Sequence, residues 1–275
     1  MQDPRSRQTS FNTSSRDQWT TFSSHRQKVT NLLVTSSNRP QSRLCVLGAG
    51  NANDLDLQSL LAVHREVHLV DLDSEALAQA AQRQQVARHP ALHLAGGVDL
   101  TAILDTIQTW SPSTSIRTET LQSLAEAPAA RVPLALQAPF DLVASTCLLS
   151  QLIGNAFHAL SDRHPQFLAV VQAIRAGHLR LLTSLTAPGG VAILITDLAS
   201  SNTFAPLASL PESSFPSLLP DLARRRAFIH GVDPAVILPL LRLNPSIASL
   251  ESVTPWLWQL HTRRYLVWAV KCQIR

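Results

Sequence analysis

The feature that most constrains this chain is a series of short apolar runs, each followed by a turn and then by a helical pattern. We read the runs as strands, and they cover residues 44–47, 67–70, 92–94, 140–145 and 191–197. A strand that is apolar throughout is buried on both faces, which is typical of parallel sheets. Helices that connect such strands pack back onto the sheet through right-handed crossovers. The sequence therefore predicts an α/β fold with a mostly parallel sheet and helices on both faces.

The rest of the chain is interpreted from periodicity and from turn residues. Helices are expected after Asn53, over 74–88, near 101–110, over 148–160 and over 165–185. A turn is expected at 187–190, irregular structure over 111–138 and 201–235, and a two-stranded ribbon at 256–258 and 265–270.

The N-terminal region divides into a polar stretch and a helix. Residues 1–16 are polar and predicted to be disordered. A helix over 17–33 would pack through Trp19, Phe22 and Val29, with His25 on another side.

Positive charge is concentrated in this N-terminal arm. Residues 1–43 contain seven Lys and Arg against two Asp, whereas 44–275 contain sixteen basic and seventeen acidic residues. A weakly basic arm rich in Ser and Thr is usually solvated, so the charge gives little support for nucleic-acid binding. We expect a polar basic arm and helix over 1–40 and a single domain over 41–275. Within that domain, 41–198 would form the ligand-binding core, and 199–275 would carry a substrate-side insertion and the last strands.

The sequence also bears on location. No stretch approaches the roughly eighteen consecutive apolar residues of a membrane span, and the first twenty residues lack the apolar segment of a secretory signal. The cysteines Cys45, Cys147 and Cys272 are far apart and lie in apolar runs, which favours reduced, buried thiols. We therefore predict a cytoplasmic protein with no membrane partner.

Three features follow the first three predicted strands: the turn over 48–53, Asp71 and Asp99. Ligands of open parallel sheets bind at the carboxyl ends of the strands. A glycine turn lets backbone N–H groups approach a ligand just before a helix N-terminus. An acid after the second strand suits the two hydroxyls of a ribose, and an acid or its backbone after the third suits an adenine amino group. Together they predict a pocket for an adenosine moiety.

With these residues in place, the chain resembles the class I S-adenosylmethionine-dependent methyltransferases. The resemblance rests on five segments in the family's order: LCVLGAGNANDLDL (44–57), VHLVDLD (67–73), HLAGGVDL (93–100), FDLVAST (140–146) and LTAPGGVAILITDL (185–198). It implies a Rossmann-like, mostly parallel seven-stranded sheet with helices on both faces, whose last strand is antiparallel and includes 265–270. It also implies S-adenosylmethionine as cofactor and transfer of its methyl group to an acceptor, here expected to be a small molecule.

The resemblance carries roles over by position. It implies a cofactor site made of Gly48, Ala49, Gly50, Asn51, Asn53, Asp71, Leu72, Val98, Asp99, Ser145 and Thr146. Two positions depart from the family pattern, because Val46 stands where an acid is frequent and Ala52 where the third glycine falls. Our hypothesis is that Asn51, Asn53 and Asp54 supply the missing polar contacts to the methionine part of the cofactor. No residue is identified as a catalytic base, and the histidines show no metal spacing.

Three alternatives remain at this point. A dinucleotide site would need Gly or Ala where Asn53 stands, five positions after the first glycine. A polyamine-synthase-like aminopropyltransferase would favour an acid near Ser145 and Thr146. A non-catalytic cofactor-binding protein is compatible with the lack of a recognisable catalytic residue.

Several other residues have a structural interpretation beside a functional one. Asp73 is expected to cap the following helix, Asp141 is as compatible with a turn contact as with a ligand, and Cys147 is interpreted as a buried thiol. His230 is a candidate for the substrate site, and the run 224–226 is expected to be a solvated basic surface.

Overall fold

In the computed structural model, which describes residues 4–37, 39–211 and 214–275, seven strands form one sheet. The strands are β1 (Arg43–Leu47), β2 (Glu66–Val70), β3 (Leu92–Ala95), β4 (Phe140–Thr146), β5 (Thr186–Ser200), β6 (Ile247–Leu260) and β7 (Arg263–Ile274). Their order is β3-β2-β1-β4-β5-β7-β6. Strands β1 to β5 are parallel to one another, and β7 is antiparallel to both β5 and β6. The predicted Rossmann-like sheet with an antiparallel last strand is confirmed.

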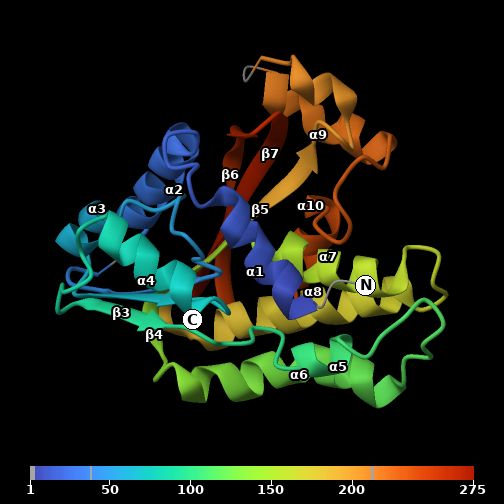
Figure 1. The fold of residues 1–275 in the computed structure, drawn as a ribbon, viewed down its shortest axis with the longest axis horizontal. Helices are drawn as coiled ribbons and strands as arrows, with labels where there is room; N and C mark the ends of the chain where they lie inside the picture. Colours follow the sequence, from blue (N-terminus) through green and yellow to red (C-terminus); the bar gives the residue numbers. More distant parts are fainter. Residues whose placement is uncertain (1–3, 38, 212–213) are drawn as a thin grey trace.

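Helices cover both faces of the sheet (Figure 1). They are α1 (Pro4–Ser15), α2 (Ser23–Thr35), α3 (Leu57–Val63), α4 (Ser74–Arg83), α5 (Leu104–Ile107), α6 (Thr118–Ala135), α7 (Leu149–Leu160), α8 (Phe167–Ser184), the 3-10 helix η1 (Ala205–Ala208), α9 (Phe215–Arg224) and α10 (Pro234–Arg242). Alternate residues of β1 belong to two hydrophobic cores, one on each face of the sheet. Leu44 and Val46 of β1 pack with α2, α3 and α4, whereas Cys45 and Leu47 pack with helices from α5 to α10. This alternation follows from the period of two along a strand.

The N-terminal arm is more ordered than the sequence predicts. The expected disorder over 1–16 is wrong for the described part, because α1 occupies Pro4–Ser15; the first three residues lie outside the described range. Helix α2 begins only at Ser23. His25 was expected away from the packed side, but it is only 1% exposed. Its Nδ1 accepts a hydrogen bond from Trp256 Nε1 at 3.0 Å, which gives the buried ring a polar partner.

The proline-rich stretches also differ from expectation. Helix α6 lies within the stretch expected to be irregular and contains Pro128 and Pro133. Such prolines argue against a helix in sequence-based reasoning, but α6 packs along α8. The approach is close at Gly177 of α8, where an added Cβ would clash with the backbone oxygen of Leu124. Helix α9 was missed in the same way, whereas the helix expected near 101–110 is reduced to α5.

Strand β5 is longer than predicted. Thr186 already pairs with Phe140, and the next pair is Val191 with Leu142. The glycine-containing segment 187–190 is therefore an irregularity inside β5 rather than a turn before it, and Gly189 there has φ +72°. The predicted terminal ribbon extends to the full lengths of β6 and β7.

The fold brings three loops to the carboxyl edge of the sheet, where α1 runs across the front of the molecule (Figure 1). Within the described residues, no helix combines the length and apolarity that crossing a membrane requires.

Candidate functional site

The glycine turn after β1 has a left-handed backbone at alternate positions. Gly48 has φ +76°, Gly50 has φ +45° and Ala52 has φ +46°. Glycine adopts this conformation without steric cost, whereas alanine does not. The chain thus keeps the backbone path of a three-glycine turn with alanine in the third place. The N–H groups of Gly48 and Ala49 both donate to the carbonyl of Val70, at 2.9 and 3.2 Å, which ties the turn to the end of β2.

Asp71 connects the ends of the first three strands. Its Oδ2 accepts a hydrogen bond from the Gly50 N–H at 2.9 Å, and its Oδ1 accepts one from the Asp73 N–H at 2.9 Å. Its backbone carbonyl accepts from the Val98 N–H at 3.1 Å. Burial raises the pKa of Asp71, and the two backbone donors oppose that rise. The carboxylate therefore lies at the rim of the sheet beside the glycine turn.

The acid after the third strand has a local role in this structure. Asp99 Oδ1 accepts from the N–H and the hydroxyl of Thr101, at 2.8 and 2.6 Å, and Oδ2 accepts from the Leu104 N–H at 2.7 Å. The side chain thus fixes the turn that leads into α5. Asp73 caps α4 by accepting from the Ala76 N–H, as the sequence predicts.

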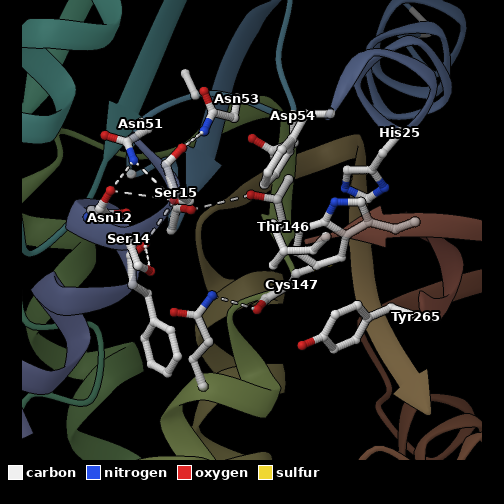
Figure 2. A pocket seen from close by; sticks show the side chains of 18 of the residues that line it. Asn12, Ser14, Ser15, His25, Asn51, Asn53, Asp54, Thr146, Cys147 and Tyr265 are labelled. Atoms are coloured by element: carbon white, nitrogen blue, oxygen red, sulfur yellow. Dashed lines mark hydrogen bonds between the residues drawn. The ribbon is translucent and has the colours of Figure 1, made fainter. Parts of the chain in front are cut away.

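A cavity of about 430 Å³ opens beside the glycine turn. Six of the residues predicted for the cofactor site line it: Gly48, Ala49, Gly50, Asn51, Asn53 and Thr146. Asp71, Leu72, Val98, Asp99 and Ser145 do not belong to its lining. Ser145 is fully buried and its hydroxyl is hydrogen-bonded to His178 Nε2 at 2.7 Å, so it faces the core. Figure 2 shows the turn residues on one side of this cavity and His25 and Tyr265 on the other.

Asp54 is the one carboxylate among the described residues that line the cavity. Burial raises the pKa of Asp54 to about 7. A side chain with this pKa is partly ionised near neutral pH, and it would become fully ionised beside a cationic ligand. The cavity also contains the thiol of Cys147, and burial raises the pKa of that thiol well above its usual value.

An aromatic wall forms the side of the cavity opposite the glycine turn, and sequence reasoning did not find it. We define it as Phe22, His25, Trp258 and Tyr265. Trp258 stacks on His25 with ring centres 4.7 Å apart, and its ring centre lies 5.1 Å from those of Phe22 and Tyr265. Burial lowers the pKa of His25 to about 3, so this imidazole is neutral. The sequence signal available was the alternation of Trp256 and Trp258, of which Trp256 is buried and Trp258 reaches the cavity.

Helix α1 closes the other end of the site. The Asn51 amide donates to the backbone oxygen of Asn12 at 2.6 Å, and the Asn53 amide donates to that of Ser15 at 2.6 Å. The Asn12 amide donates to Asp73 Oδ2 at 3.2 Å. These α1 residues carry no motif, so sequence reasoning missed them.

Other candidate residues lie outside the cavity. His230 packs against Phe157 and Phe167 and does not line it. Asp141 is a structural acid, because it accepts from the Arg43 N–H and pairs with Arg39. Arg224 and Arg225 pair with Asp221 and are exposed, as expected of a solvated surface. Cys45, Cys147 and Cys272 are free and buried, which confirms the prediction of buried thiols.

Among the described residues, one group of potential metal ligands occurs where β2 and β3 pair, and Glu66, His68 and His93 bring ligand atoms within 4.8 Å of one another there. Arg43 already binds the carboxylate of Glu66 at 2.6 Å and lowers its pKa to about 2, together with His68. Burial lowers the pKa of His68, so its contact with Glu66 is a hydrogen bond from a neutral imidazole. The Glu66 carboxylate is therefore satisfied by Arg43 and His68.

Comparison with known proteins gives similarities of fold only. No protein-family model matches the chain, and no curated protein does. Among solved structures, the chain is similar to the N-methyltransferase NodS from Bradyrhizobium japonicum with S-adenosyl-L-homocysteine, at 14% identity over 92% of this chain and 87% of that one, with a TM-score of 0.42.

Two further structures give comparable values. YcgJ from Bacillus subtilis shares 10% identity over 90% and 99% of the two chains, with a TM-score of 0.45. Magnesium protoporphyrin IX methyltransferase ChlM from Synechocystis with S-adenosyl-L-homocysteine shares 13% identity over 91% and 82%, with a TM-score of 0.43.

Proposed function

We propose that this protein is an S-adenosylmethionine-dependent methyltransferase that acts on a small-molecule acceptor. The observation that carries the proposal is the hydrogen bond from the Gly50 N–H to Asp71 Oδ2, because it joins the glycine turn to a carboxylate at the carboxyl edge of the sheet. Nucleoside ligands of open α/β sheets bind at this edge. The five sequence segments that resemble the methyltransferase family support the same conclusion.

The residues around the cavity fit the methionine part of the cofactor. Asn53 is 3% exposed and its Oδ1 has no hydrogen-bond partner in the described structure. A buried polar atom without a partner is costly, and a ligand ammonium group would satisfy it. The nearby carboxylate of Asp54 would pair with the same positive charge. This assignment keeps the hypothesis that the polar residues of the turn replace the acid missing at Val46, which is fully buried in β1.

When bound, S-adenosylmethionine supplies a methyl group activated by the positive charge on its sulfur. The chain's contribution is to bind and orient the cofactor and the acceptor and to exclude water from the reacting atoms. In this proposal Gly48, Ala49 and Gly50 present backbone to the methionine part, and Asp71 accepts hydrogen bonds from the ribose hydroxyls. Leu72, Val98 and the backbone of Asp99 contact the adenine. Thr146 supports the turn, because its hydroxyl donates to the Gly48 carbonyl at 3.5 Å.

The aromatic wall would receive the acceptor, since it faces the turn across the cavity. Apolar rings exclude water from the reacting atoms and hold an acceptor by surface contact. We name no general base. The buried free thiols suit the cytoplasmic location that we propose for the enzyme.

Isothermal titration calorimetry on the full chain tests the proposal. We expect S-adenosylmethionine and S-adenosylhomocysteine to bind, and NAD⁺ and decarboxylated S-adenosylmethionine to bind much more weakly or not at all. Asp71→Asn keeps the shape of the side chain but removes its charge, and it should weaken S-adenosylhomocysteine binding about tenfold or more, as expected for charge-assisted hydrogen bonds.

The matched control is Asp141→Asn, because Asp141 is an acid at the opposite end of the sheet. It should leave the affinity unchanged. Binding of NAD⁺ alone, or equal affinities for the Asp71→Asn and Asp141→Asn variants, would refute the assignment.

A further inference from the structure

Helix α1 occupies part of the site assigned above to the cofactor, and its contacts there resemble those of a ligand. The amide of Asn12 donates to Asp73 Oδ2 at 3.2 Å, and its approach to the Asp71 carboxylate opposes the rise in the pKa of that group. The Oδ1 of Asn12 lies so close to Gly50 that an added Cβ there would clash with it. Asn12 therefore fills the space above Gly50 and the Asp71 carboxylate, which is where a ribose would lie.

The end of α1 satisfies the donors of the turn. The last carbonyl groups of a helix have no partner within the helix and carry partial negative charge. Here the Asn12 carbonyl accepts from the Asn51 amide and the Ser15 carbonyl accepts from the Asn53 amide, both at 2.6 Å. Asn51 also donates to the Ser15 hydroxyl at 3.1 Å. Figure 2 shows these side chains directed at α1. The carbonyl groups thus take the place of ligand oxygens.

Outside the site, α1 contacts α5 and α7. Arg5 forms an exposed ion pair with Asp105 at 3.3 Å, and the Gln8 side-chain oxygen accepts from the buried Asn155 amide at 3.4 Å. From Arg5 to Ser15, none of the residues of α1 is buried. The helix has twelve residues, many of them Ser, Thr and Asn, with no acid in its first turn and no base in its last. Helices of this length and composition are marginal in water. Its order therefore depends on tertiary contacts, and the contacts with the site hold its last turn.

We infer that α1 is an internal competitor of the adenosyl ligand: it docks over Asp71 and the glycine turn through Asn12 and Ser15 and leaves when the ligand binds. The inference rests on the proposed function, because it takes Asp71 and the turn as the ligand site. With a competitor, the apparent affinity equals the intrinsic affinity multiplied by the fraction of molecules in which the competitor is undocked. A lid, in contrast, would gain contacts with the ligand and raise the affinity.

Two full-chain variants distinguish these roles. Asn12→Ala removes the side chain above Gly50. Thr13→Ala is the matched control, because Thr13 is exposed and its hydroxyl donates only to the Thr9 carbonyl within α1. Both changes raise helix propensity similarly, so their difference isolates the docking contacts. We expect Asn12→Ala to bind S-adenosylhomocysteine about fivefold more tightly than the wild type, the effect of losing roughly one docking hydrogen bond. Thr13→Ala should bind no more tightly than the wild type.

Hydrogen exchange on the unmodified full chain supplies the second measurement. We expect addition of S-adenosylhomocysteine to speed the exchange of the α1 amides while it slows exchange in the turn over 48–54. If the ligand binds but protects α1, or if Asn12→Ala weakens binding, α1 is a lid and the inference is overturned while the proposed function stands. If neither the wild type nor Asn12→Ala binds the ligand, the proposed function fails, and the competitor role fails with it.

Discussion

The carboxylate of Asp71 accepts the N–H of Gly50 at 2.9 Å and the N–H of Asp73 at 2.9 Å, so one side chain satisfies two backbone donors from two loops. Asp71 is 6% exposed. This arrangement makes the residue structural as well as a candidate ligand group, and the two roles need different substitutions to separate them.

Replacing Asp71 with alanine should destabilise the fold clearly. The change leaves the N–H groups of Gly50 and Asp73 buried without partners, and each costs about 1–3 kcal/mol. We expect Asp71→Ala to lower the free energy of unfolding by roughly 2–6 kcal/mol and Asp71→Asn to lower it by about half as much, because asparagine keeps an acceptor oxygen for one of the two donors. Denaturant unfolding measures both. Equal stability of the two variants would contradict the dual role.

Two helical glycines, Gly177 in α8 and Gly154 in α7, differ in the space around them, and replacing each with alanine should have opposite effects on stability. A Cβ at Gly177 would clash with the Leu124 backbone oxygen, and backbone cannot move aside locally. We expect Gly177→Ala to destabilise the protein by about 2 kcal/mol or more through overpacking. At Gly154 of α7 an added Cβ meets nothing within 4 Å, so Gly154→Ala should stabilise by about 0.5–1 kcal/mol. Thermal unfolding of the pair checks the sign of each change.

Buried His178 predicts a specific acid sensitivity. Burial lowers the pKa of His178 to about 4 from 6.5. A histidine with a lowered folded pKa contributes its full stability above pH 6.5, and that contribution is lost as the pH falls from 6.5 toward 4, because the unfolded state binds the proton more tightly. The stability of the wild type relative to His178→Gln should therefore fall by up to about 1.4 kcal/mol per pH unit in this window.

Asp54 predicts a pH dependence of ligand binding. Its pKa is raised to about 7 in the ligand-free cavity. A ligand ammonium group favours the ionised carboxylate. Below pH 7, Asp54 must therefore lose a proton when the ligand binds. The dissociation constant for S-adenosylhomocysteine should rise by up to about tenfold per pH unit as the pH falls below 7. Asp54→Asn should bind weakly at every pH and lose this dependence. Calorimetry from pH 5.5 to 8 is the measurement, and a persistent dependence in Asp54→Asn would assign it to another group.

The sheet and the turn were predictable because their signals are local. Each of the first four strands is a compact apolar run, and Gly48 and Gly50 mark the turn where the backbone must be left-handed. Asp71 follows its strand directly, so the topology alone brings it to the edge of the sheet.

Two elements escaped prediction because tertiary contacts override their composition. Helix α6 contains Pro128 and Pro133, and its place against α8 holds it helical. Helix α1 has the composition of a disordered segment, and Asn51 and Asn53 hold its last turn from a distant part of the chain.

The aromatic wall was missed for a different reason. Phe22 immediately precedes α2 and His25 lies in its first turn, whereas Trp258 and Tyr265 come from β6 and β7. Its members lie in two segments near opposite ends of the chain, and the residue spacing within one segment gives no information about the other segment. The contact between His25 and Trp258 exists only once the last two strands join the sheet beside β5.

A crystal structure of the full chain with S-adenosylhomocysteine tests the central claim most directly. We expect the ribose hydroxyl oxygens within about 2.5–3.0 Å of the Asp71 carboxylate, the usual range for such hydrogen bonds, with Asn12 displaced from above Gly50. A ligand bound elsewhere, or a ribose that makes no contact with Asp71, would contradict the account.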